Sequence, residues 1–337
     1  MVLESHIGVY CSISDESVYG TYTETSQIFV PLLSESLVQN VSRIMRDQEM
    51  TGSNRWSRKP VQNQILPVEG QIKFNWYLDD IAGYFLRAMF GAATSSNLSG
   101  SAYKHVWYPG ATQSRSLSIG IRRGGNSTEW RFAGCKIKKV SWQLNNDDNM
   151  MICTVDIIGQ QYSTGDTDAV SGLGTTIAPR FFEASLTDDA GSAQAIVNWS
   201  YEIDFALNTD LSKLFKWGQQ YIIEPTPAGV MVLRGNVTKN FDSSDDHAIY
   251  TAYRALTEYD RLCTFVTTQS IPSGGGNVYR MNVDNPKAII NEYTPPQYAG
   301  PGIMQHSQVY DSYEGTTDNS NTAPVEFVLQ NATSAYS

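Results

Sequence analysis

The chain has 337 residues, which is enough for two domains of ordinary size that each bury a core. Hydrophobic residues make up 41% and charged residues 17%, a composition that suits a folded, strand-rich protein better than a disordered one. The formal net charge is -10, with 15 Lys and Arg against 16 Asp and Glu up to Val170 and 9 against 18 after it, which argues against a protein that binds phosphate backbones through basic clusters.

An edge strand or arm is predicted at residues 27–33. The sequence there, QIFVPLL, is an apolar run interrupted by Pro31, and proline is confined to strand edges because it has no N–H for the ladder. Residues 34–67 are then polar, and we expect them to form a long projecting loop. Loops of this length usually serve a function in compact domains. Its charged side chains include Arg43, Arg46, Asp47, Arg55, Arg58 and Lys59.

Two stretches, residues 67–90 and 232–256, repeat one order of elements. Each begins with an apolar strand centred on a glycine, Gly70 or Gly235, and reaches a pair of aspartates before helical spacing begins. An aspartate pair could serve acid-base chemistry or hold a metal, but its position at a helix start favours a capping role. The pairs are Asp79 with Asp80 and Asp245 with Asp246.

A hairpin with one apolar and one polar face is predicted around residues 145–149. Apolar residues alternate with polar ones in KKVSWQL and again in MMICTVDIIG, with the turn sequence NNDDN between them. Strands of this kind bury one face and leave the other in water. The polar face carries Ser141, Gln143, Thr154 and Asp156.

The order of elements in the first half recurs in the second half, at a separation of about 150 to 165 residues, which indicates a duplicated domain. Residues 163–195 are rich in Gly, Ser, Thr, Asp and Ala, and we interpret them as a linker. The predicted organisation is therefore a first β-domain at residues 1–162, with the projecting loop at 34–67, and a second β-domain at residues 196–337. Each domain is expected to have one flanking α-helix.

No residue pattern indicates catalysis, a metal site or a cofactor. The four cysteines lack a CxxC pair, the histidines lie far apart, and the glycine-rich residues 273–280 lack the Lys-Ser/Thr of a phosphate loop. No stretch approaches the roughly 18 apolar residues that a membrane helix needs. The first residues lack the basic and apolar regions of a signal peptide, so we expect the chain to remain in a cytoplasm.

Several segments, in their order and spacing, resemble the tail tube proteins (major tail proteins) of long-tailed, siphovirus-type bacteriophages. They are ESVYGTYTETSQIFVPLLSESL, EGQIKF, the helix end RAMFG, GCKIKKVSWQL and TVDIIGQ. The resemblance covers the first half well and the second half by pattern. The residues that carry it are Glu16, Tyr19, Gly20, Thr21, Ser34, Glu35, Ser36, Leu37, Gly70, Gly134 and Cys135.

The resemblance implies a mainly β fold, a β-sandwich or rolled barrel with one flanking helix, and a structural role in the virion. Simpler tube proteins contribute one such domain per chain, whereas the repeat predicts two tandem tail-tube-type domains here. The resemblance further implies self-assembly into rings that stack as a hollow tube, through which DNA passes during genome ejection. The implied partners are other copies of the chain, the tape measure protein, the tail terminator and the distal tail proteins, with no membrane and no cofactor. The loop at 34–67 would stack successive rings, and Ser141, Gln143, Thr154 and Asp156 would face the lumen.

The resemblance also implies a ring symmetry, because tube proteins with one domain per chain close with six domains. A chain with two such domains would need three copies, and its ring would be a homotrimer with pseudo-sixfold symmetry. Two alternatives stay open at the level of sequence. One is a tail terminator or neck protein that forms a single ring, and the other is a sugar-binding β-sandwich adhesin, which would share the Tyr and Trp content. The basic loop could also be an ordinary solvated surface.

Overall fold

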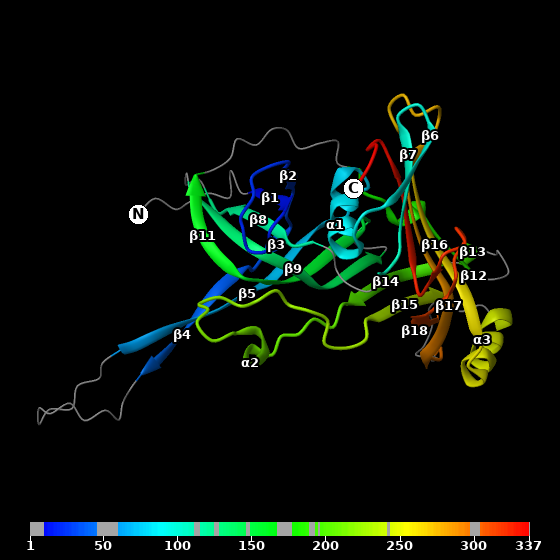
Figure 1. Cartoon of the computed structure of the whole chain (residues 1–337). Coiled ribbons are helices and arrows are strands. Elements are labelled where there is room, and N and C mark those ends of the chain that lie inside the picture. Colours follow the sequence, from blue (N-terminus) through cyan, green and yellow to red (C-terminus); the bar gives the residue numbers. More distant parts are fainter. Residues whose placement is uncertain are drawn as a thin grey trace, which may run out of the picture.

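Long antiparallel strands form most of the protein, as the alternating sequence predicts (Figure 1). The computed structural model describes residues 10–45, 60–110, 115–124, 128–145, 149–166, 177–188, 193–194, 196–240, 243–296 and 304–336. The helices in these residues are α1 (Asp80–Phe90), α2 (Leu211–Leu214), α3 (Ser243–Ala255) and the 3-10 helix η1 (Phe181–Glu183). The mainly β class that the sequence predicts is therefore confirmed.

The strands fall into two groups along the chain. The first half contains β1 (Tyr10–Asp15), β2 (Ile28–Val30), β3 (Ser34–Glu35), β4 (Val38–Met45), β5 (Pro60–Asn75), β6 (Thr94–Ser99), β7 (Ala102–Trp107), β8 (Leu117–Arg122), β9 (Thr128–Asn145), β10 (Ile152–Gly159) and β11 (Gln161–Asp166). The second contains β12 (Ala184–Asp188), β13 (Ala193–Gln194), β14 (Ile196–Asp204), β15 (Val232–Asn240), β16 (Glu258–Ser270), β17 (Val278–Thr294), β18 (Gln305–Tyr313), β19 (Gly315–Thr316), β20 (Thr322–Ala323) and β21 (Glu326–Asn331).

Strand β9 belongs to two layers of sheet. Its first part pairs with β8 and β11, and its second part pairs with β10 and β14. Gly134 lies at the change of layer with φ +68, a left-handed conformation that favours glycine, and an added Cβ there would lie 2.7 Å from Cβ of Gln160. A strand that changes layers in this way forms the corner of a β-sandwich.

The same pairing pattern occurs in both halves. Strand β5 pairs with β10, β10 with β9 and β9 with β8, while β15 pairs with β18, β18 with β17 and β17 with β16. Helix α1 follows β5, and α3 follows β15. The central glycines occupy matching positions, because Gly70 lies opposite Ile157 and Gly235 opposite Tyr310. Both halves also have a register shift at the matching place. In β9 it follows Ile137, which is aligned with Gly70 through Ile157 of β10, and in β17 it follows Ile290, which is aligned with Gly235 through Tyr310 of β18.

One sheet runs through both halves, in the order β5, β10, β9, β14, β15, β18, β17. The step from β9 to β14 joins them through seven residue pairs, from Asn145 opposite Asn198 to Lys139 opposite Asp204. The apolar core is likewise one connected cluster, although the length of the chain allows two separate cores. At its centre the rings of Trp142 and Phe327 lie 5.5 Å apart, and those of Trp142 and Trp76 lie 5.4 Å apart.

The last described residues return to the first half. Strand β21 pairs with β7 on one side and with β17 on the other. The side-chain amide of Asn331 donates a hydrogen bond to the backbone carbonyl of Asp79 at 3.2 Å. The ring of Tyr336 lies against Gly83 of α1, where an added Cβ would be 2.0 Å from its Cζ. Residues far apart in sequence therefore close the core around α1.

The region expected to be a loop, residues 34–67, needs correction. Strands β4 and β5 pair along it as the two arms of a hairpin, which extends away from the rest of the protein in Figure 1. Polar side chains occur on both arms, so the sequence lacks the apolar alternation that would have indicated strands. A hairpin holds its arms through backbone hydrogen bonds and does not need a buried face along its whole length.

The linker expected at residues 163–195 also contains strands. Strand β11 pairs with β9, and β12 adds to β16 in the second half. Ile177 is buried and its carbonyl accepts a hydrogen bond from the N–H of Leu78 at 2.7 Å. The described parts of this region are therefore short structured pieces, because strand pairing uses the backbone and tolerates small polar side chains.

The capping role predicted for the first aspartate pair is confirmed. Asp79 is the N-cap of α1, and its carboxylate accepts a hydrogen bond from the N–H of Ile81. Burial, with the neighbouring charge of Asp80, raises the pKa of the Asp79 carboxyl to about 7. In the second pair, Asp245 and Asp246 lie within α3, which begins at Ser243, and their side chains are outside the described part of the structure.

The raised pKa of Asp79 predicts a pH dependence of stability. Because the folded state holds this proton more tightly than the unfolded state, whose ordinary value is 3.8, the protonated carboxyl stabilises the fold at low pH. This contribution should be lost as the pH rises from about 4 to about 7, by less than about 1.4 kcal/mol per pH unit because the side chain is partly exposed. We expect urea unfolding of Asp79→Asn, which keeps a capping side chain, to show a weaker pH dependence. Parallel curves for Asp79→Asn and the unchanged chain would contradict the assignment. Asp80→Asn should weaken the pH dependence less, because the charge of Asp80 is a smaller cause of the raised pKa than burial.

Candidate functional site

The sheet that runs through both halves has one polar face. The register of six strand pairs places its members on one side of the sheet, together with the apolar residues Ile152, Ile158, Val232 and Val309. The residues between them, such as Trp142 and Tyr201, are buried on the other side. We define the polar face by Glu69, Gln71, Lys73, Lys139, Ser141, Gln143, Thr154, Asp156, Ser200, Glu202, Asp204, Arg234, Asn236, Thr238, Glu292, Thr294, Ser307 and Asp311.

The four residues predicted from the hairpin lie together on this face. Ser141 is directly opposite Thr154, and none of Ser141, Gln143, Thr154 and Asp156 is buried. The sequence therefore located this part of the polar face correctly, although it gave no sign that the face continues over β14, β15 and β18. Whether these side chains line a channel remains a prediction.

Carboxylates outnumber cations on the polar face. The cations are Lys73, Lys139 and Arg234, and the carboxylates are Glu69, Asp156, Glu202, Asp204, Glu292 and Asp311. Two of the cations are in ion pairs, Lys139 with Glu202 at 2.7 Å and Arg234 with Asp311 at 3.0 Å. Burial raises the pKa of Asp156, which the nearby lysines partly offset. Such a surface offers few fixed partners for a phosphate group.

The predicted ring-stacking residues lie mostly outside the described residues. Arg43 is in β4, but its side chain is not described. The others, Arg46, Asp47, Arg55, Arg58 and Lys59, fall between the two arms of the β4–β5 hairpin, in residues 46–59, which the described ranges omit. Their role therefore remains a prediction, and the described arms show only that the hairpin projects (Figure 1).

Glu16 forms a buried acceptor site in the first half. Its carboxylate accepts hydrogen bonds from the N–H groups of Gly20 at 2.9 Å and Gly134 at 2.7 Å, and from the hydroxyls of Ser116 at 2.7 Å and Ser118 at 3.0 Å. Burial raises its pKa, and these four hydrogen bonds oppose the rise. Glu16 thus fixes the Tyr-Gly-Thr segment onto β8 and the corner of β9.

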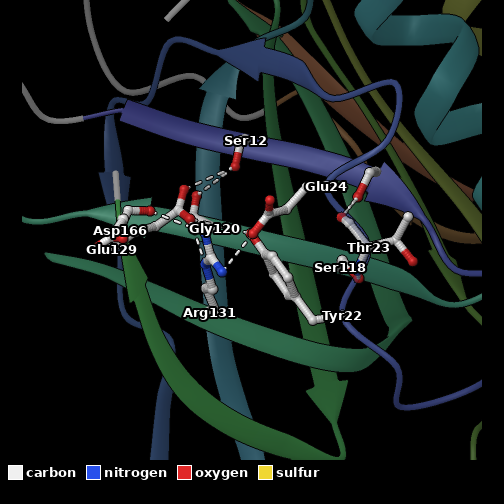
Figure 2. A network of polar contacts seen from close by, with 10 residues as sticks. Ser12, Tyr22, Thr23, Glu24, Ser118, Gly120, Glu129, Arg131 and Asp166 are labelled. Atoms are coloured by element: carbon white, nitrogen blue, oxygen red, sulfur yellow. Dashed lines mark hydrogen bonds and ion pairs between the residues drawn. The ribbon is translucent and has the colours of Figure 1, made fainter. Parts of the chain in front are cut away.

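A second buried carboxylate belongs to Glu129 of β9, in the layer of sheet that contains β1, β8 and β11 (Figure 2). It accepts hydrogen bonds from the Ser12 hydroxyl at 3.2 Å, the Tyr22 hydroxyl at 3.4 Å and Nε of Arg131 at 3.0 Å. Arg131 also pairs with Glu24 at 2.5 Å, and its guanidinium lies over the Tyr22 ring. The segment from Tyr22 to Glu24 is therefore held by charge-assisted hydrogen bonds.

These two networks explain several residues of the sequence motifs and were not predicted. Glu16, Gly20 and Gly134 stand in the quoted segments, but nothing in their spacing indicates that they contact one another. Glu129 is charged and fully buried within a strand, a position that a binary pattern assigns to an apolar residue. Both carboxylates are fully engaged with structural donors, so their arrangement serves folding.

Within the described ranges, no group of three or more His, Cys, Asp or Glu could hold a metal ion. The four cysteines are buried, and burial raises the pKa of the Cys135 and Cys153 thiols well above the ordinary value, which disfavours the reactive thiolate. None of the helices that the structure describes is both long and apolar enough to span a membrane.

Comparison with known proteins agrees with the motif resemblance. A family model described as a phage tail tube protein matches residues 9–328 of the chain. The match extends over both halves, including the second half, where the sequence motifs resemble the family only by pattern. No match was found among curated proteins.

The Glu16 site predicts a specific loss of stability. Glu16→Gln replaces a carboxylate oxygen by an NH2 group, which cannot accept from the donors that converge there, so we expect the free energy of unfolding to fall by about 1 to 3 kcal/mol. The matched control is Glu24→Gln, since the Glu24 side chain is 52% exposed and its ion pair with Arg131 should contribute less than about 1 kcal/mol. Equal effects of the two substitutions in chemical denaturation would show that the buried hydrogen bonds are not what holds this segment.

Proposed function

Because the chain belongs to the phage tail tube protein family, we propose that it is a structural subunit that assembles into stacked rings around a channel for DNA. The observation that carries the proposal is the continuous sheet, which presents one polar face across both halves and ends in strand edges that can pair with other copies. The proposal assigns the chain no reaction. As a tail tube protein it is a component of the virion tail, and we place its assembly in the host cytoplasm.

The repeated pairing pattern supports two tandem tube domains in each chain. The domains would be residues 1–162 and 196–337, and the β9–β14 pairing would be the junction between them. The C-terminal residues of the second domain would then complete the core of the first, as β21 does beside β7. If six such domains complete a ring, three chains are enough, and the ring has pseudo-sixfold symmetry.

The polar face suits the wall of a channel for DNA. Its carboxylates repel phosphates, and the ion pairs of Lys139 and Arg234 with carboxylates weaken their attraction for DNA. Contacts between basic side chains and phosphates would have to break each time the DNA advanced, so a wall without them lets DNA slide. We therefore place Ser141, Gln143, Thr154 and Asp156 in the lumen.

The β4–β5 hairpin suits contact between successive rings. It projects beyond the rest of the chain (Figure 1), and the segment between its arms carries Arg46, Asp47, Arg55, Arg58 and Lys59. Single ion pairs at a surface contribute roughly 0 to 1 kcal/mol, but a ring repeats each contact in every chain. At the ends of the tube, the same surfaces would meet the tail terminator and distal tail proteins, while the tape measure protein would occupy the channel.

Electron microscopy of the purified, concentrated protein tests the function. We expect hollow tubes, and a cryo-EM reconstruction should show three chains per ring, two similar domains in alternation and the polar face toward the channel. Single closed rings without tubes would favour a tail terminator or neck protein. Six chains per ring would contradict the tandem-domain proposal but leave a tube subunit, and a particle that stays monomeric would contradict assembly itself.

The hairpin contact is tested by deleting residues 49–58. This change leaves both described arms in place, so we expect a folded protein that forms rings but no long tubes. The control replaces the same residues by a Gly/Ser segment of equal length, which removes the charges and keeps the reach. Tubes of normal length from the deletion variant would show that the hairpin does not stack rings. Tubes from the Gly/Ser control alone would assign stacking to the length of the hairpin and not to its charges.

A further inference from the structure

The junction inside the chain provides a template for the junction between chains. Strand β14 lies between β9 and β15, and its central residue Tyr201 is opposite Trp142 on one side and Gly235 on the other. The N–H of Phe205 donates to the carbonyl of Lys138 at 3.0 Å. In an antiparallel ladder this makes Tyr201 and Trp142 a hydrogen-bonded pair, with Glu202 and Ser141 a non-hydrogen-bonded pair.

The counterpart of β14 in the first half is the segment formed by β3 and the start of β4. This segment pairs with β5 as β14 pairs with β15, with Ser34 opposite Lys73 and Val38 opposite Glu69. The same register places Leu37 opposite Gly70, the counterpart of Gly235, so Leu37 corresponds to Tyr201, and both are buried. In the described ranges β3 and β4 pair with β5 alone, which leaves their outer edge open.

The counterpart of β9 in the second half is β17. Aligned at the shared register shift, Lys139 and Ser141 correspond to Glu292 and Thr294. Beyond Ile289, which is opposite Glu258, the described strands pair with β17 only through β18, on one side. Helix α3 contacts Tyr293 through Tyr250 and Tyr253, on the side of the sheet opposite the polar face, so this contact is with the face of β17 and no described strand pairs along its second edge there.

We infer that residues 38–41 of one chain pair antiparallel with residues 291–294 of a neighbouring copy, in the register of the β9–β14 junction. Val38 would lie opposite Thr294 and Asn40 opposite Glu292, as Glu202 lies opposite Ser141 and Asp204 opposite Lys139 within the chain. The inference rests on the proposed assembly into rings, and it names the surface that closes them. The pairing would cover Val38 and Val41, which are 40% and 49% exposed.

A second observation fixes where this pairing ends. The residue opposite Leu37 would be Pro295, which has no N–H to donate. Within the chain, the Leu37 carbonyl instead accepts a hydrogen bond from Nη2 of Arg123 at 2.6 Å, and the Leu37 N–H donates to the Glu35 carboxylate at 3.1 Å. Arg123 therefore supplies the donor to the Leu37 carbonyl that Pro295 of the neighbouring strand lacks, and Glu35 accepts from the Leu37 N–H.

Engineered cysteines test the register, since the four native cysteines are buried. We expect Val38→Cys with Thr294→Cys to link neighbouring chains of assembled tubes into covalent trimers on mild oxidation. The matched control, Ser141→Cys with Glu202→Cys, joins the equivalent pair inside one chain and should stay monomeric on a denaturing gel. Asn40→Cys with Glu292→Cys is a second variant, in case the first does not assemble.

The outcomes separate this inference from the proposed function. The variant Gln39→Cys with Thr294→Cys is the negative control, because its two side chains would lie on opposite faces of the sheet. The register is supported if either intermolecular pair links the chains and this control does not. Tubes of normal appearance in which both intermolecular pairs stay reduced, while the internal control oxidises, overturn the inference and leave the tube assignment standing. If the unchanged protein forms neither rings nor tubes, the proposed function fails, and the inference fails with it.

Discussion

The backbone hydrogen bonds between β9 and β14 are the constraint on which the rest of this structure depends. A sheet edge must be paired, covered or otherwise protected, because its free N–H and C=O groups invite pairing with another chain. Here one half of the chain supplies the partner for the other, and the two become a single sheet with a common core. The aromatic cluster of Trp142, Tyr201 and Phe327 then packs beneath this junction, so neither half keeps a core of its own.

Buried carboxylates hold other parts of the chain in place. Glu16 and Glu129 hold the segment between β1 and β2 against one layer of sheet, through donors that come from several strands. Because the desolvation of a buried carboxylate must be offset by its hydrogen bonds, only one placement of that segment is favourable. Arg123 and Glu35 act in a similar way on a single edge residue, Leu37. Polar side chains therefore fix particular segments of the chain beside the sheet, while apolar ones supply the core.

Local patterns predicted local features of the fold. The alternation of apolar and polar residues predicted that Ser141 and Thr154 share the polar side of the hairpin. The position of Asp79 before an apolar helix predicted its capping role. The arms of the β4–β5 hairpin escaped prediction because they lack apolar alternation. The contacts of β21 with β7 and of Tyr336 with α1 join residues more than 200 positions apart, and no local signal marks them. For the same reason, the sequence identified the hairpin part of the polar face but not its extension across β14, β15 and β18.

The return of residues 326–336 to the first half affects how the chain can fold during synthesis. Strand β21 lies between β7 and β17, and Tyr336 fills the space beside Gly83 of α1. The first half therefore leaves the ribosome with an unfilled core, and it gains its final packing only after residues 326–336 have been translated. Folding is thereby coupled to translation, because the packing around α1 stays incomplete until residues 326–336 have been made and have joined it.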